Sequence, residues 1–213
     1  IAKNPYLPTS AEIQSKLSAI DYRAIMLDAE QKTVTFTKAG MQMDLGAIAK
    51  GYIADKIAQN LSEAYGATID LGGNIVVLGR HKGGWKIGIQ TPFADTGLYT
   101  AIVKAPSGET TTVVTSGTYE RNFIKNGKLY HHIFDPESGY PANSETEAIS
   151  IIGKTSLYAD AYATYLFMLP PEDVITFAKK NGFELSEEDL AEIDEEIKKL
   201  ERKDFTTPEG LEN

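Results

Sequence analysis

The sequence contains no cysteine among its 213 residues. Disulfide bridges, thiolate metal centres and a cysteine nucleophile are therefore excluded. No apolar run approaches the length that spans a bilayer as a helix. Histidine is scarce, with three residues, which leaves few candidates for a proton acceptor that works near neutral pH.

Charge is distributed unevenly along the chain. The formal net charge is -9, but residues 184–213 hold twelve Asp or Glu and four Lys or Arg, so the first 183 residues are nearly neutral. A body without a basic patch is not expected to bind nucleic acid. The acidic tail disfavours anionic membranes and nucleic acid alike.

The acidic tail has the pattern of an amphipathic helix. A capping pattern begins at Ser186, and apolar residues follow at helical spacing at Leu190, Ile193, Ile197 and Leu200. Such a helix either packs against its own chain or binds a partner, and the pattern does not decide between them.

The remaining sequence favours an α+β domain with an antiparallel sheet core. Apolar spacing predicts helices that begin at Ser10 and Asp44, and further helices over 156–169 and 172–181. Alternating and turn-bounded segments predict a larger number of strands, at 24–27, 33–37, 68–71, 75–78, 85–90, 99–104, 111–115, 122–124, 130–134 and 147–152. Most of these strands follow one another through hairpin turns, which is typical of antiparallel pairing.

The segment Y-H-H-I-F-D-P-E-S-G-Y-P at 130–141 places two adjacent histidines before a stiff turn. An imidazole held by such a loop is material for a general base. In a strand His131 and His132 face opposite sides, so only one of them can face a site.

The segment A-D-A-Y-A-T at 159–164 places Asp160 and Thr164 four residues apart on a predicted helix. They share a face. A carboxylate and a hydroxyl on one face suit a hard cation such as Mg²⁺. Alternatively, Asp160 is solvated and Thr164 bonds to its own helix backbone.

Three further segments allow both a structural and a ligand-binding interpretation. Asp44 opens D-L-G-A-I-A-K-G, either as a helix cap or as part of a phosphate site with Lys50. Gly72 and Gly73 form a tight turn, or a loop that lies close to a ligand. The polar segment 116–121 holds either a ligand or its own loop.

Together these motifs resemble the ApbE family of flavin transferases. The resemblance rests on D-L-G-A-I-A-K-G-Y-I-A-D at 44–55, D-L-G-G-N-I at 70–75, S-G-T-Y-E-R at 116–121, H-I-F-D-P-E-S-G-Y-P at 132–141 and A-D-A-Y-A-T at 159–164, in that order. It implies an ApbE-like fold related to the T-fold, lacking the family's N-terminal region. Residues 1–183 would form part of the catalytic region, and 184–213 the acidic tail.

The resemblance implies a Mg²⁺-dependent enzyme that moves FMN from FAD onto a threonine or serine hydroxyl of an acceptor flavoprotein and releases AMP. Two alternatives stay open, namely a Mg²⁺-dependent FAD pyrophosphatase and a flavin-binding module without catalysis. Family members are commonly exported lipoproteins, which implies an extracytoplasmic location and a membrane anchor in an N-terminal segment.

The resemblance also implies roles for individual residues. His132 matches the base that deprotonates the acceptor hydroxyl. The matches to metal ligands are Asp160, Thr164 and the backbone carbonyl of Ala47. The matches to flavin-nucleotide contacts or site-forming loops are Asp44, Lys50, Ile133, Gly72, Gly73, Ser116 and Arg121.

Overall fold

The computed structural model describes residues 5–95, 97–144 and 146–181. Its helices are α1 (Ser10–Leu17), the short 3₁₀ helix η1 (Tyr22–Ala24), α2 (Ala49–Asn60), α3 (Ser156–Phe167) and α4 (Pro171–Lys180). Its strands are β1 (Ile25–Asp28), β2 (Thr33–Phe36), β3 (Gly66–Asp70), β4 (Asn74–Gly79), β5 (Trp85–Gln90), β6 (Tyr99–Ala105), β7 (Thr111–Gly117), β8 (Asn122–Lys125), β9 (Lys128–His131) and β10 (Ala148–Gly153). All strand pairs are antiparallel, so the expected α+β class is confirmed.

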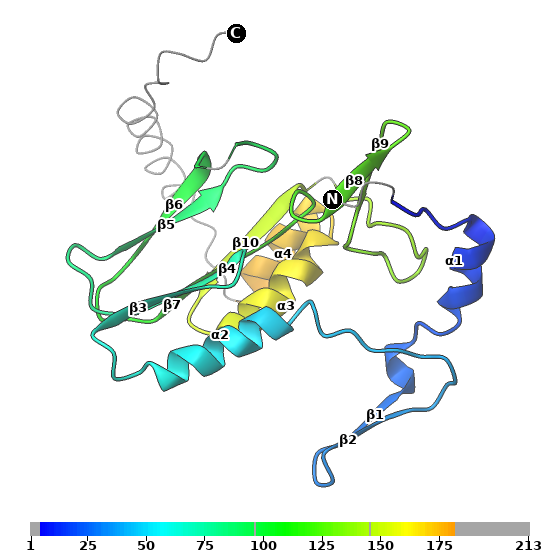
Figure 1. Cartoon of the computed structure of the whole chain (residues 1–213), viewed down its shortest axis with the longest axis horizontal. Coiled ribbons are helices and arrows are strands. Elements are labelled where there is room, and N and C mark those ends of the chain that lie inside the picture. The colour runs from blue at the N-terminus through cyan, green and yellow to red at the C-terminus, as the bar shows by residue number, and fades with distance from the viewer. Residues whose placement is uncertain (1–4, 96, 145, 182–213) are drawn as a thin grey trace.

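A four-stranded sheet in the order β10-β7-β4-β3 forms the centre of the fold. Helices α2 and α3 lie against one face, and the β5–β6 hairpin lies on the other side (Figure 1). Strand β4 contributes to the packing on both faces of the sheet, because successive side chains of a strand point to opposite faces. Val76 and Leu78 pack with Ala54 of α2, whereas Val77 packs with Ile87 of β5.

Helix α1 packs on the loop that follows β9. Its N-cap is Thr9, one residue before the expected Ser10, and Glu12 completes a capping box with Thr9. Half-buried Ile13 and Leu17 reach Gly139, where any Cβ would lie 3.0 Å or less from their side chains. The helix therefore contacts the loop at Gly139, but none of its residues is fully buried and Ile20 is exposed.

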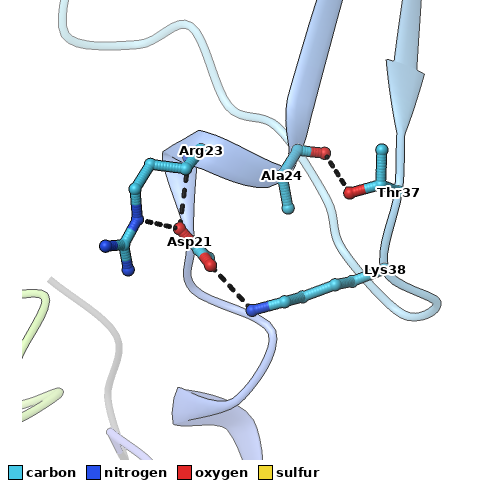
Figure 2. A network of polar contacts seen from close by, with 5 residues as sticks. All are labelled: Asp21, Arg23, Ala24, Thr37 and Lys38. Carbon is cyan, nitrogen blue, oxygen red and sulfur yellow. Dashed lines mark hydrogen bonds and ion pairs between the residues drawn. The ribbon is translucent and has the colours of Figure 1, made fainter.

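The β1–β2 hairpin extends away from the central sheet (Figure 1). A polar network at its base fixes the connection to η1 (Figure 2). The Asp21 carboxylate accepts hydrogen bonds from Lys38 Nζ at 2.7 Å and Arg23 Nε at 2.9 Å, and these partners hold the Asp21 pKa well below its ordinary value. Thr37 donates to the Ala24 carbonyl through its amide and its hydroxyl, so the two strands stay in register.

The predicted strands match the observed ones to within a few residues, but the predicted start of the second helix was wrong. Helix α2 begins at Ala49 rather than Asp44, because residues 46–48 form a turn. The Asp44 side chain accepts a hydrogen bond from the Gly46 amide at 2.6 Å and does not cap the helix. The predicted tail helix lies outside the described residues.

Within the described ranges, no helix is both long enough and apolar enough to cross a membrane.

Candidate functional site

A cavity of about 810 Å³ opens between the central sheet and the β5–β6 hairpin. Four of the residues predicted from the motifs line it, namely Lys50, Gly72, Gly73 and Arg121. They come from α2, the β3–β4 turn and the loop after β7. The fold therefore brings three of the five sequence motifs to one cavity.

The β3–β4 turn is shaped by its two glycines. Both have positive φ, at +71° for Gly72 and +74° for Gly73, a region that other residues rarely adopt. A side chain at Gly73 would also collide with the carboxylate of Glu120. Lys50 Nζ donates to the Gly72 carbonyl at 2.6 Å, which ties the first turn of α2 to this loop.

Asp160 lies where α2 and α3 are in close contact at Gly51. Its side chain is 4% exposed, and its Oδ2 accepts a hydrogen bond from the Gly51 amide at 2.7 Å. The contact depends on glycine, because a Cβ at position 51 would lie 2.7 Å from Asp160 Cβ and 2.8 Å from Leu157 Cα. The packing of two helices therefore fixes the position of this carboxylate.

The Asp160 carboxyl has a raised pKa. Burial is the main cause, and the Gly51 amide and the charge of Lys50 partly oppose it. Among the described residues only Gly51 donates a hydrogen bond to this carboxylate. The second oxygen, Oδ1, thus remains available to a cation, which would lower the cost of ionising the group.

Thr164 lies one turn after Asp160 on the same helix, as the spacing predicted. Its hydroxyl is 3.5 Å from the Asp160 carbonyl oxygen and 3.3 Å from Ser116 Oγ of β7. Both contacts are long for hydroxyl hydrogen bonds. The Thr164 hydroxyl therefore lies near both its own helix backbone, as the alternative interpretation predicted, and Ser116, and neither contact holds it tightly.

Asp55 is a structural contributor that the motif analysis did not single out. Its two carboxylate oxygens accept from the amides of Ser156 at 2.8 Å and Leu157 at 3.0 Å, so a residue of α2 caps the first turn of α3. Asp55 is the last residue of the segment 44–55, but its role could not be predicted from that motif. The partner amides lie about a hundred residues away in sequence.

A buried polar network lies under the same end of α3. Ser156 Oγ donates to Asn74 Oδ1 at 2.6 Å and receives a hydrogen bond from Thr112 Oγ1 at 3.1 Å. All three side chains are fully buried. Asn74 Nδ2 has no hydrogen-bond partner among the described residues.

The two adjacent histidines have different environments. His131 is half-buried, packs edge-on against Phe167 and places Nε2 3.1 Å from the Ala142 carbonyl. Its pKa is lowered, chiefly by burial. His132 is exposed, and its Nδ1 lies 3.2 Å from the Arg121 carbonyl. If Nδ1 carries the proton, Nε2 of His132 is an open proton acceptor.

His132 borders a second cavity of about 410 Å³. Phe123, Tyr130 and Phe134 contribute to its largely aromatic wall. Glu120 and Arg121 line both this cavity and the larger one. The proposed base and the larger cavity therefore meet at one pair of charged residues.

Six predicted residues do not line either cavity, namely Asp44, Ala47, Ser116, Ile133, Asp160 and Thr164. Asp44 and Ala47 are exposed in the segment before α2, and Ile133 is buried with Ala142 and Phe167 in a small apolar cluster. The Ile133 side chain therefore anchors the loop after His132 in the apolar core. Roles for Asp44 and Ala47 in ligand binding stay predictions.

The donor set fits a hard cation but rests on one carboxylate. In the described part of the chain, no group of three or more His, Asp or Glu gathers into a metal cluster. A Mg²⁺ site would use the free oxygen of Asp160, the hydroxyl of Thr164 and the backbone carbonyl of Ala47. Oxygen ligands of this kind, completed by water or phosphate oxygens, are those that Mg²⁺ prefers.

The sequence matches the ApbE family over residues 1–186. A protein of Klebsiella pneumoniae (strain 342) named FAD:protein FMN transferase is 41% identical over 168 residues, which cover 78% of this chain and 51% of that protein. A protein of the same name from Treponema pallidum (strain Nichols) is 41% identical over 180 residues, covering 76% of this chain and 49% of its own length. The chain spans about half the length of these curated relatives.

Solved structures show the same architecture. The ApbE protein of Thermotoga maritima superposes with a TM-score of 0.71 at 32% identity, over 85% of this chain and 59% of that one. The apo flavinyl transferase ApbE of Pseudomonas stutzeri gives a TM-score of 0.67 at 28% identity, over 84% of this chain and 55% of its own.

Proposed function

This chain belongs to the ApbE family, and we propose that it carries the catalytic half of an FAD:protein FMN transferase. In the proposed reaction, a threonine or serine hydroxyl of an acceptor protein attacks the FMN phosphorus of FAD. The new phosphoester bond forms as the bond to the AMP oxygen breaks, and AMP leaves with that electron pair. The names of the relatives support the flavin transfer, and the geometry described above supports the individual roles.

The observation that carries the proposal is the position of His132. It is exposed beside an aromatic cavity, which shares Glu120 and Arg121 with the larger cavity. A hydroxyl is a weak nucleophile until a nearby base removes its proton, and an imidazole is suited to that task near neutral pH. The His132 imidazole would therefore take the acceptor proton where the two cavities meet.

The larger cavity would receive the nucleotide. Lys50 and Arg121 supply positive charge at its wall for the pyrophosphate, and the glycine turn lets the backbone approach a ligand closely. Bound Mg²⁺ would supply Lewis-acid stabilisation of the charge on the leaving phosphate. Asp160, Thr164 and Ala47 are the residues proposed to hold it, with Asp160 fixed by the Gly51 amide.

Hydrolysis of FAD to FMN and AMP is the second candidate. The exposure of His132 favours it, because the same imidazole is open to water as well as to an acceptor hydroxyl. The two reactions share every step except the identity of the attacking oxygen. Transfer and hydrolysis are therefore distinguished by their products, since both would use the same site.

Mass spectrometry of an acceptor peptide tests the proposal. The chain is incubated with FAD, Mg²⁺ and a peptide that contains Asp-Gly-Ala-Thr-Gly-Ala-Thr. The expected result is a mass gain of one FMN moiety on the peptide. No mass gain is expected when EDTA is present during the incubation. FMN and AMP without a modified peptide would favour hydrolysis, and intact FAD would contradict catalysis by this chain.

We also propose an extracytoplasmic location for the whole protein, on the basis of the family resemblance alone. Fractionation of cells that express the complete gene product tests it. Recovery with cytoplasmic markers would contradict it.

A further inference from the structure

The β8–β9 hairpin carries basic and aromatic side chains on one face. Phe123 pairs directly with Tyr130, and Lys125 pairs with Lys128. Directly opposed residues in an antiparallel pair project to the same side, and alternate residues along each strand do so too. These four side chains therefore share one face of the hairpin.

Arg121 lies in the bend just before β8, and His132 lies in the bend just after β9. Both residues line the smaller cavity together with Phe123 and Tyr130, and the Arg121 carbonyl lies 3.2 Å from His132 Nδ1. We call this surface the basic-aromatic face. Its residues are Arg121, Phe123, Lys125, Lys128, Tyr130 and His132.

The face is preorganised. Phe123 and Tyr130 stack with ring centroids 5.2 Å apart and planes 12° apart, and Lys128 Nζ lies 5.6 Å from the Tyr130 ring. Asn126 and Gly127 join the strands with φ of +53° and +73°, the signs that a type I′ turn requires. A tight turn of this kind holds the two lysines at a fixed place at the tip.

The face also carries unbalanced positive charge. Arg121, Lys125 and Lys128 are its three permanent cations, and no carboxylate of the described residues forms an ion pair with any of them. Glu120 lines the cavity beside this face. The hairpin projects from the body of the molecule, so a second polypeptide has room to reach it (Figure 1).

We propose that the basic-aromatic face docks the acceptor polypeptide as an extended segment with acidic residues beside its threonine or serine. This inference rests on the proposed function. The stacked rings would support the segment, Lys125 and Lys128 would pair with its carboxylates, and His132 would meet the hydroxyl at the end of the face. Charge complementarity of this kind gives orientation and partner choice.

The test measures binding, which needs no turnover. The probe is a fluorescein-labelled synthetic peptide with one threonine flanked by aspartate and glutamate, and a matched peptide has lysine at the flanking positions. Fluorescence anisotropy gives the Kd of each peptide for the full chain. The acidic peptide is expected to bind more tightly, and its affinity should fall as salt is raised. Equal affinities for the two peptides would overturn the proposal.

The double variant Lys125→Glu/Lys128→Glu locates the contact. Contacts between exposed charges are individually weak, so reversing two of them is expected to raise the Kd of the acidic peptide about tenfold. The matched control, Lys179→Glu/Lys180→Glu on α4, makes the same change of net charge elsewhere and should have less than a twofold effect. Equal losses in the two double variants would contradict docking at the hairpin.

Flavin fluorescence separates this inference from its alternatives. If the hairpin lysines serve FAD, the Lys125→Glu/Lys128→Glu variant loses affinity for FAD as much as for the peptide, and the proposal is wrong. If the acidic peptide binds at the hairpin but no FMN is transferred, the docking surface stands and the proposed transferase activity of this chain fails. Thermal denaturation of both double variants confirms that each is folded.

Discussion

The Asp160 carboxylate of α3 accepts a hydrogen bond from the Gly51 amide of α2 at 2.7 Å, although the two residues are 109 positions apart. This contact joins α3, which carries two of the three proposed metal ligands, to α2, which carries Lys50. It requires a residue without a Cβ on one side and a short carboxylate on the other. Several measurable properties depend on it.

We expect Asp160→Asn to raise the melting temperature at neutral pH in the absence of divalent cations. Burial raises the pKa of the Asp160 carboxyl, so the folded state binds its proton more tightly than the unfolded state does. Stability is therefore lost as pH rises above the unfolded pKa, and the uncharged asparagine avoids that loss. Melting curves across pH check this. The two proteins should converge at about pH 3, where both states are protonated, and a lower melting temperature for the variant throughout would contradict the assignment.

Addition of Mg²⁺ should give the unaltered chain a higher melting temperature than Asp160→Asn. A cation that binds only the folded state raises the melting temperature with concentration, and its free energy of binding depends on the Asp160 charge. We expect the shift in the unaltered chain and none in Asp160→Asn. Glu172→Gln, at an exposed position of α4, is the control and should respond like the unaltered chain. Equal shifts in all three proteins would rule out Asp160 as a ligand.

Replacement of the two histidines by alanine should have different effects, a loss of transfer for His132 and a loss of stability for His131. His132 is exposed, so His132→Ala should change the free energy of unfolding by less than about 0.5 kcal/mol while abolishing transfer to the acceptor peptide. His131 packs on Phe167 and contacts the Ala142 carbonyl, so His131→Ala should cost about 1–3 kcal/mol. Urea unfolding and the transfer assay measure the two effects. Full transfer by the His132 variant would exclude it as the base.

Gly51→Ala should separate α2 from α3. The added methyl would collide with the Ser156 carbonyl and lie 2.7 Å from Asp160 Cβ, which overpacks the interface at a cost of about 1–3 kcal/mol. Gly153→Ala is the matched control, since its Cβ would meet only Thr112 Cγ2 at 4.0 Å. Chemical denaturation of both variants checks the difference, and equal stabilities would show that the helices are not in contact at Gly51.

Asp55→Ala removes the cap that α2 provides for α3. The Ser156 and Leu157 amides lose their acceptors, and loss of such a cap typically costs about 1–2 kcal/mol. Asp55→Asn keeps one acceptor oxygen and should retain part of that stability. The midpoint of urea unfolding, at constant slope, reports both changes. If alanine and asparagine are equally tolerated, the cap contributes nothing to stability.

The sequence predicted the strands and the helix α3 well, because alternation and apolar spacing are local properties. The start of α2 was misplaced for a local reason too, since Asp44 bonds to the nearby Gly46 amide in a turn that resembles a helix cap in sequence. The role of Asp55 could not be read from spacing, because its partners become neighbours only when α2 meets α3.

The candidate site was predictable in its composition more than in its arrangement. Alternation predicted that only one of His131 and His132 could face a site, but both line the smaller cavity. The burial of His131 against Phe167, which distinguishes their environments, depends on tertiary packing. The shared lining of the two cavities by Glu120 and Arg121 likewise depends on tertiary packing. The resemblance supplied roles for Asp44 and Ala47 that stay predictions.

The turn at the tip of the β8–β9 hairpin has a chemical consequence for stored protein. Asn126 precedes Gly127 at an exposed position, and asparagine before glycine readily cyclises and loses ammonia, because glycine does not hinder attack by the next amide nitrogen. The product would place a new carboxylate between Lys125 and Lys128. Ageing at alkaline pH would thus neutralise part of the positive charge at the tip, and fresh and aged samples of one preparation would differ in their affinity for an acidic segment.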